Sequence, residues 1–493
     1  MDRYICLIAS VACSITGVLM LDYDLESRGE LSLYEFVYRS IRRDIEAGTL
    51  APHEKLPSKR AFAQHLGVSL ITVENAYAQL VTEGYCYTRP RSGYYVSELS
   101  AVTSVTKRDK SAPATFVTLP DEAHPDVRHD LSRVDADPAM VSRVWGRALR
   151  RVLSVESDEE LYGPQPPKGT LRLRHAIAHK LRETRGFEAD PACIVVGAGS
   201  QLLDAALVQL LQPRGSVALE NPGYPRLAQI YESAGLSVRS IGLDNEGMSM
   251  EELRASDASL VHVMPSHQFP TGIVTSISRR YELLAWASET EGRYIVEDDY
   301  DAPFRMAGRP VASLASIDVA GHVIYTNTFS KSLGPALRMA FMVLPPRLAE
   351  AWEERVGFYA NTVIPLDQLA LARFIEQGHY DRHVNRMRTH ARKTQDALVN
   401  ALREAFGGRV AFAGLNDGLH FIMQLESERS ERELAVAAEA AGIRIAPLSN
   451  FAGTATKTDA MSTTFPARFI LRSDSVSAEE TSAVASALAK AWA

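Results

Sequence analysis

The sequence predicts an α/β protein in two parts, a small winged helix–turn–helix at the N-terminus and a large domain around a mostly parallel β-sheet. Two observations lead to this fold class. Helical periodicity and a short β-hairpin follow one another before residue 97, and beyond residue 145 apolar strand-like runs alternate with helical stretches. At 493 residues the chain is also too long for one compact core.

The composition is that of an ordinary globular protein and excludes several classes. Hydrophobic residues make up 46% and charged residues 23% of the chain, and there is no internal repeat. Because the net charge is −7, any contact with nucleic acid must come from a local patch. The four cysteines are scattered without a CxxC pair, which indicates a reducing compartment and predicts neither a metal site nor disulfides.

Residues 1–24 are interpreted as an N-terminal extension that is either disordered or the product of a mis-set translation start. An uncharged, mostly apolar run extends from Tyr4 to Leu21. A secretory signal or a short membrane anchor can have this composition, but the run contains serine, threonine and glycine and is at the lower length limit for a membrane span. Met20 is a suitable start for the working chain, so we expect no association with a membrane.

Residues 25–97 have the pattern of a winged helix–turn–helix. Glycines end the first and third predicted helices, and Ser58 is a plausible N-cap for the second. The inward residues of the first helix are expected to be Tyr34, Val37, Ile41 and Ile45. The predicted elements are helices over residues 33–47, 58–66 and 72–83 and strands over residues 85–88 and 93–96.

The rest of the chain is predicted to be a linker and a larger domain. Residues 98–130 are rich in Ser, Thr, Pro, Asp and Lys, which is typical of a semi-extended linker, and residues 131–493 form the domain. After residue 366 the pattern is helical and then mixed, which predicts a smaller C-terminal α/β lobe. Strands are expected at residues 194–196, 217–219, 260–263, 294–296, 323–325 and 341–344.

The N-terminal part resembles the DNA-binding head of the GntR family of bacterial regulators. The resemblance rests on Leu56-Pro57-Ser58-Lys59-Arg60, Leu66-Gly67-Val68-Ser69, Thr72-Val73 and Glu83-Gly84-Tyr85. It implies binding to double-stranded DNA, with the third helix in the major groove and the wing near the backbone or the minor groove. The side chains expected to contact DNA are Ser58, Arg60, Ser69, Thr72, Asn75 and Arg91.

This head departs from the family pattern in two ways. The family usually has arginine directly after the serine of the turn, where this chain has Leu70. Residues 25–100 carry nine Lys/Arg and nine Asp/Glu, so the head is net neutral and its affinity is expected to depend on dimerisation. A winged helix used for protein contacts is the alternative interpretation.

A lysine directly after a predicted strand is the strongest chemical signal. Lys331 lies in Thr328-Phe329-Ser330-Lys331, and Arg338 follows seven residues later. Pyridoxal phosphate (PLP) needs an amine for its internal aldimine and hydroxyl and arginine donors for its phosphate. The pattern therefore predicts Lys331 as the PLP lysine, with Thr328, Ser330 and Arg338 at the phosphate.

Carboxylates at the end of the preceding predicted strand suit the pyridine ring. A carboxylate can hold the ring nitrogen protonated, and a tyrosine hydroxyl can bond the ring oxygen. In the segment Glu297-Asp298-Asp299-Tyr300-Asp301 we assign these roles to Asp298 and Tyr300, with Glu297 and Asp299 as alternatives to Asp298.

Two further segments are predicted to contact the cofactor. The turn Gly197-Ala198-Gly199-Ser200-Gln201 leads from a strand into a helix, whose free amides and positive dipole end suit a phosphate. Ser200 and Gln201 are therefore predicted phosphate-binding residues. Tyr224 is predicted to stack on the pyridine ring.

These residues, together with Tyr162-Gly163, resemble fold-type I aminotransferases. The combination of Pro265-Ser266-His267-Gln268-Phe269-Pro270-Thr271-Gly272 with the Asp298 and Lys331 segments, behind a GntR-like head, is similar to the MocR/GabR subfamily. The resemblance implies a fold-type I PLP-dependent aminotransferase-like domain and a homodimer with each head over the partner subunit. Where aminotransferases have an asparagine on the ring oxygen, this chain has Phe269, so efficient turnover is not expected.

The resemblance also implies two arginines for the acid group of an effector. Arg468 stands where aminotransferases carry a C-terminal carboxylate-binding arginine, and Arg226 matches a carboxylate-binding arginine of the GABA-sensing members. Two guanidiniums favour an amino acid or an amino sulfonate such as taurine. The alternative is that either arginine belongs to a surface ion pair.

The sequence thus predicts a cytoplasmic, dimeric, PLP-dependent transcription regulator. A small amino compound would form an external aldimine, and domain closure would reach the head through the linker. No catalytic residue is assigned, because the aminotransferase-like domain is expected to sense its effector. The alternatives are an active aminotransferase with a vestigial head and a regulator of PLP synthesis that senses PLP itself.

Overall fold

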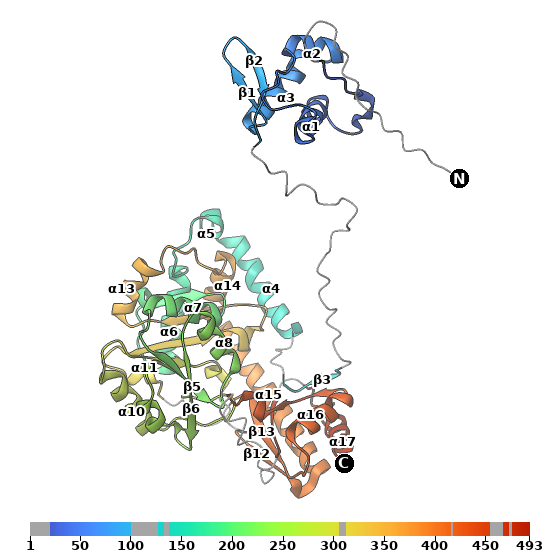
Figure 1. Ribbon diagram of the computed structural model, residues 1–493. Helices are drawn as coiled ribbons and strands as arrows, with labels where there is room; N and C mark the ends of the chain where they lie inside the picture. Colours follow the sequence, from blue (N-terminus) through green and yellow to red (C-terminus); the bar gives the residue numbers. More distant parts are fainter. Residues whose placement is uncertain are drawn as a thin grey trace. The chain divides into compact units, whose positions relative to one another are not determined.

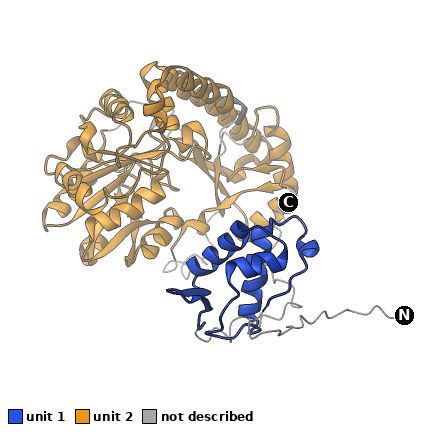
Figure 2. Ribbon diagram, turned by 90° about the horizontal axis from the view of Figure 1, so that it is seen from above, with its two compact units in different colours: residues 1–121 blue, residues 122–493 orange. Residues whose placement is uncertain are grey.

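The computed structural model describes residues 20–99, 127–132, 138–304, 312–415, 418–453, 467–472 and 476–493. Contacts divide the chain into two compact units, residues 1–121 and 122–493 (Figure 2). Most of the predicted N-terminal extension and of the predicted linker lies outside the described residues. Within the described ranges, no helix has both the length and the apolar character needed to cross a membrane.

The first unit is the predicted winged helix–turn–helix (Figure 1). Side-chain hydroxyls cap its second and third helices, since Ser58 accepts from the amide of Ala61 and Ser69 from the amide of Thr72. The strands of the wing pair in an antiparallel hairpin. The elements are η1 (Leu25–Arg28), α1 (Leu33–Glu46), α2 (Lys59–Leu66), α3 (Leu70–Thr82), β1 (Cys86–Arg89) and β2 (Gly93–Val96).

The prediction of the inward residues of the first helix was wrong at one position. Three residues of α1 are buried as expected, but Tyr34 is 41% exposed, and Tyr38 takes an inward position and donates to Glu83. The reason is that the buried stripe of α1 begins one turn later than Tyr34. Leu21 and Tyr23 also pack into this core, so the packed head includes residues that a boundary at residue 25 leaves out.

The second unit is built on an eight-stranded sheet of order β4-β11-β10-β9-β8-β5-β6-β7. It is mostly parallel, as predicted, with antiparallel pairing only for β11 and β7. Strand β6 was not predicted, because only one of its residues is buried and two of them, Arg239 and Asp244, are charged. The strands are β4 (Ile194–Gly197), β5 (Ser216–Asn221), β6 (Val238–Asp244), β7 (Gly247–Met248), β8 (Ala258–Val263), β9 (Tyr294–Asp298), β10 (Val323–Thr328) and β11 (Ala340–Val343).

Helices before, between and after these strands bury apolar side chains in the core around the sheet (Figure 1). They are α4 (Pro138–Val155), α5 (Asp158–Tyr162), α6 (Leu171–Arg185), α7 (Ser200–Leu211), α8 (Pro225–Ser233), α9 (Met250–Ala255), α10 (Ile277–Ser288), α11 (Leu314–Ile317), α12 (Ser330–Leu333), α13 (Pro346–Arg355) and α14 (Pro365–Glu376).

The long helix α15 (His379–Phe406) leads into the smaller C-terminal lobe, which has its own apolar core. A four-stranded antiparallel sheet of order β12-β13-β16-β15 forms this lobe, and β3 pairs with β14 beside it. Its other elements are β3 (His129–Asp130), β12 (Val410–Ala413), β13 (His420–Leu425), α16 (Glu431–Ala440), β14 (Ile443–Arg444), β15 (Ala446–Pro447), β16 (Ala467–Arg472) and α17 (Thr481–Ala491).

Candidate cofactor and DNA-binding sites

The predicted cofactor residues lie at one end of the strands of the large sheet. The strand register pairs Thr328 of β10 with Ala340 of β11, and Ala340 with Gly197 of β4. On the other side of β10, Thr326 pairs with Asp298 of β9. The turn that carries Lys331, the carboxylate segment and the turn before α7 therefore lie at the same end of the sheet. This is where open α/β sheets bind ligands.

A cradle suited to a phosphate lies at the N-terminus of α7. Gly199 has a φ of +95°, and a Cβ at this position would collide with Nη2 of Arg338. The guanidinium of Arg338 is therefore directly against the first turn of α7, where Ser200 and Gln201 begin the helix. Nearby, the amide of Ser330 donates to the hydroxyl of Thr328 at 3.1 Å. Helix amides, an arginine and hydroxyls form a donor set that fits the phosphate of PLP.

Replacing Gly199 by alanine is expected to weaken PLP binding by at least about tenfold, since the new Cβ displaces Arg338 and strains a positive φ. The measurement is a fluorescence titration of cofactor-free protein with PLP. Gly186→Ala is the matched control, because Gly186 also has a positive φ, of +71°, but has open space around its Cβ position. Equal affinities of the two variants would contradict the placement of the phosphate.

The three neighbouring carboxylates at the end of β9 have different partners. Glu297 accepts hydrogen bonds from the amides of Leu314 and Ala315, both at 2.8 Å. Asp299 forms a buried ion pair with Arg185. Both alternatives to Asp298 are thus bound within the fold, and Asp298, partly exposed, remains the carboxylate available to a pyridine nitrogen.

Asp298 is held by a buried histidine that sequence analysis missed. Nε2 of His262 lies 3.7 Å from Asp298, and Nδ1 of His262 lies 2.8 Å from the hydroxyl of Tyr231. Burial by itself lowers the pKa of His262, but Asp298 and Asp204 raise it above the ordinary value. The sequence offered only a weak signal, a lone histidine in an apolar strand.

Asp204 of α7 is buried near His262, and burial raises its pKa from 3.8 to about 7. The folded protein therefore holds a proton that the unfolded chain has released, and its stability falls as the pH rises from about 4 to about 7. Asp204→Asn should remove this penalty, on the order of 4 kcal/mol above pH 7. We expect the melting temperature of the variant to exceed that of the wild type increasingly between pH 4 and pH 7. A pH-independent difference would contradict the assignment.

Lys331 lies beside aromatic side chains from three segments. Its Nζ is 5.5 Å from the centre of the Tyr300 ring. Phe269 lies between Tyr300 and Tyr224, with ring centres 6.3 and 6.2 Å away. Burial raises the pKa of Tyr300 well above its ordinary value, so its hydroxyl stays protonated and can donate. The structure thus brings Tyr224, Tyr300 and Lys331 to one site.

The predicted effector arginines lie differently from expectation. Arg226 is exposed at the start of α8, one residue from Pro225 and close to Tyr224. Arg468 is also exposed, and its backbone amide donates to Glu431. Four residues further along the same face of β16, Arg472 is only 4% exposed and pairs across the strands with His420.

Arg472 is the arginine that the structure places beside the cofactor site. Burial lowers the pKa of His420 well below its ordinary value, and the nearby positive charges of Arg472 and Lys331 lower it further. The same arginine opposes the rise in the pKa of Tyr300. Because side chains alternate along a strand, the sequence could have indicated that Arg468 and Arg472 lie on the same face of β16. Alternation alone does not indicate which of the two arginines is buried.

The predicted DNA-contacting residues lie on α2, on α3, at the N-caps of both helices and on the wing. Ser58, Ser69 and Thr72 already take part in capping hydrogen bonds. Arg60 and Asn75 are exposed. Arg91 is exposed at the tip of the wing, with a φ of +60°.

Two exposed apolar residues at the start of α3 were not predicted as contacts. Leu70 is 40% and Ile71 67% exposed, directly after the Ser69 cap. Apolar side chains at this end of a recognition helix can contact the methyl group of thymine. Their position after the N-cap was visible in the sequence.

The fold and the site together define a class of protein, a winged-helix DNA-binding unit joined to an aminotransferase-like domain. Residues 33–96 match the gntR family of bacterial regulatory proteins, and residues 134–457 match aminotransferase class I and II. The chain belongs to the MocR/GabR subfamily of GntR-type transcription regulators.

Relatives and a solved structure agree with this placement. The chain is 36% identical over 436 residues to the uncharacterized HTH-type transcriptional regulator YhdI of Bacillus subtilis, covering 86% of this chain and 90% of YhdI. It is 32% identical over 444 residues to the probable rhizopine catabolism regulatory protein MocR of Rhizobium meliloti, covering 88% and 89% of the two chains. A multiple substrate aminotransferase from Thermococcus profundus shares the fold, with a TM-score of 0.63 and 24% identity over 75% of this chain and 92% of that one.

Proposed function

We propose that this regulator binds operator DNA through its head and carries PLP on Lys331, where a small amino compound is sensed. The observation that carries the proposal is the contact of Arg338 with the N-terminus of α7, beside the turn that holds Lys331. A phosphate cradle next to a strand-end lysine is the arrangement that PLP requires. A protein that reads chromosomal DNA would work in the cytoplasm.

Each residue of the site has a role toward the cofactor. When bound, PLP supplies an aldehyde that can exchange a lysine amine for the amine of an effector. Asp298, oriented by His262, would hold the ring nitrogen protonated. Tyr300, whose pKa is raised by burial, would donate to the ring oxygen. Arg338 and the amides of α7 would neutralise the phosphate.

The surroundings favour sensing an acid-bearing amine over efficient turnover. Phe269 stands between Tyr224 and Tyr300 and offers no hydrogen bond to the ring oxygen. Arg472 provides a buried guanidinium at the site, and Arg226 an exposed one. A guanidinium binds a carboxylate or sulfonate through charge-assisted hydrogen bonds, so we assign the effector to the amino acids and amino sulfonates.

A homodimer would complete the entrance to this site. Large apolar side chains are exposed around it, namely Tyr162 at 77%, Leu202 at 52%, Phe358 at 72% and Ile364 at 58%. The segment that carries the last two touches the α7 turn, where the amide of Ala198 donates to the hydroxyl of Thr362 at 2.9 Å. An exposed apolar patch of this kind usually marks a protein interface.

The experiment that tests the proposal compares DNA binding with turnover. Taurine, 4-aminobutyrate and glutamate are added to PLP-loaded protein, and the same acids without their amino groups serve as controls. At least one amine should change the affinity for the promoter of the gene at fixed salt, while transamination with an oxo acid stays far below about 1 per second. Turnover at that rate, with unchanged DNA binding, would favour the aminotransferase alternative.

A further inference from the structure

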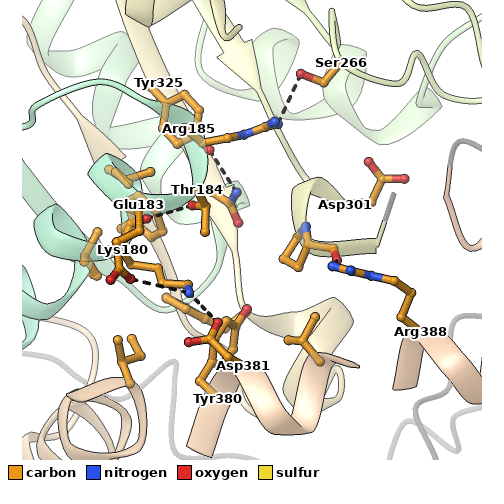
Figure 3. Close-up of a pocket in the computed structure, with 18 of the residues that line it drawn as sticks. Lys180, Glu183, Thr184, Arg185, Ser266, Asp301, Tyr325, Tyr380, Asp381 and Arg388 are labelled. Carbon is orange, nitrogen blue, oxygen red and sulfur yellow. Dashed lines mark hydrogen bonds and ion pairs between the residues drawn. The ribbon is translucent and has the colours of Figure 1, made fainter. Parts of the chain in front are cut away.

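A cavity of about 370 Å³ lies behind the turn that carries Lys331, between α6, α15 and the ends of β10 and β11 (Figure 3). Its described lining contains none of the residues assigned above to the ring nitrogen, the phosphate or the effector. It borders the cofactor site at His267 and Asp301, which pair with each other at 2.5 Å, and His267 also contacts the hydroxyl of Tyr300. The cavity thus adjoins the cofactor site but is lined by a different set of residues.

The floor of this cavity is apolar and its rim is polar. Leu181, Phe329, Phe341 and Val384 are buried among its lining residues. At the rim, Glu183 and Asp381 are about half exposed. A volume of this size and an apolar wall with a few polar groups are typical of small-molecule sites.

The positively charged side chains that line the cavity differ in their ion-pair and hydrogen-bond partners. Lys180 is paired with Asp381 (Figure 3), and Arg185 is paired with Asp299 outside the lining. Arg388 has no ion pair among the described residues, and its Nη2 donates to the carbonyl of Pro303 at 2.6 Å. Within the same described set, its Nε is buried without a hydrogen-bond partner.

A carboxylate is the group that would satisfy Arg388. A buried donor without a partner costs free energy, and a guanidinium binds a carboxylate through charge-assisted hydrogen bonds. The nearby Asp301 is already paired with His267. We propose that this cavity is a second ligand site, which binds a small carboxylate by placing its acid group on Arg388 and its apolar body against Phe329 and Phe341.

The site would lie against the back of the lysine turn. Asn327 and Phe329 line the cavity, while the alternate residues Thr328 and Ser330 bond each other on the phosphate side. Helix α15 is tied to the same turn, since Nε2 of His383 lies 2.6 Å from the carbonyl of Ser332. An occupant would thus touch both the strand that precedes Lys331 and the helix that leads to the C-terminal lobe.

Calorimetric titration of the full-length, PLP-loaded protein with 3-phenylpropanoate and with 3-phenylpropanamide tests this proposal. The carboxylate should bind at one site per chain, and the amide at least about tenfold more weakly, because only the acid can pair with Arg388. Arg388→Gln should reduce the affinity for the carboxylate by a similar factor. The matched control is Arg386→Gln, an exposed arginine of α15 outside the cavity lining, which should leave the affinity unchanged.

A second variant separates this site from the cofactor site. Binding of 3-phenylpropanoate should persist in Lys331→Ala, since the lysine does not line the cavity. Three results would overturn the proposal: no binding at millimolar concentration, equal binding of the acid and the amide to the wild type, or binding that Lys331→Ala abolishes. The comparison of acid with amide uses the unmodified protein, so it does not depend on the folding of a variant.

Discussion

Replacing Lys331 by alanine is expected to abolish covalent attachment of PLP and the absorbance of the lysine-bound cofactor. Lys331 follows a buried strand, and its Nζ lies 5.5 Å from the Tyr300 ring. The strand that precedes Lys331 pairs with β11, whose neighbour β4 leads to the turn that Arg338 approaches. The measurement is an absorbance spectrum, followed by borohydride reduction and peptide mass spectrometry.

The control for this prediction is Lys490→Ala, which removes a lysine from the last turn of α17 in the C-terminal lobe. It should keep the full spectrum and the labelled Lys331 peptide. Non-covalent binding through the phosphate cradle should persist in Lys331→Ala with reduced affinity, because Arg338 and α7 are unchanged. An unaltered spectrum in Lys331→Ala, or a label on another lysine, would show that the cofactor lysine is misassigned.

Asn75→Ala and Arg60→Ala are expected to weaken DNA binding in two different ways. Asn75 is exposed on α3, the helix expected in the major groove, so its loss should cost about 1–3 kcal/mol at one base pair and relax specificity there. Arg60 is exposed on α2, and its loss should weaken binding to all DNA sequences alike. It should also reduce by about 1 the magnitude of the slope of log binding constant against log salt concentration. Affinities for operator and random DNA at several salt concentrations measure both effects.

The matched control is Arg39→Ala, since Arg39 lies on α1 in an exposed ion pair with Glu35 and is not an expected DNA contact. It should leave both affinities nearly unchanged. If the Arg60 variant lost affinity only for the operator, or if neither Arg60 nor Asn75 changed binding, the proposed docking of the head would be wrong.

Local sequence patterns determined much of this protein. The Ser58 cap and the hairpin depend on residues a few positions apart, and both were found where they were predicted. The same holds for the buried strands of the sheet, because an apolar run between turns identifies a strand without knowledge of its neighbours. Local signals likewise predicted the three helices of the head, but not the Ser69 cap or the exposure of Tyr34. The segments of Lys331 and Ser200 were recognisable because each combines a strand end with a turn.

Only the tertiary structure shows which of several chemically similar residues already has a partner within the fold. Glu297, Asp298 and Asp299 are chemically alike in sequence. The structure distinguishes them, because Arg185 pairs with Asp299 and the amides of Leu314 and Ala315 donate to Glu297. These partners come from other segments of the chain, so no local pattern reports them.

The same reason explains the other differences from the sequence-based predictions. Arg468 and Arg472 share one face of β16, and packing of the C-terminal lobe against the large sheet buries only Arg472 beside His420. The contacts of His262 are with Asp298 and Tyr231, which lie on other elements, so its sequence neighbours did not indicate them. The sequence determined which chemical groups this protein carries and which elements hold them. Burial and long-range pairing, which depend on contacts between distant segments, determined which of those groups can meet a ligand.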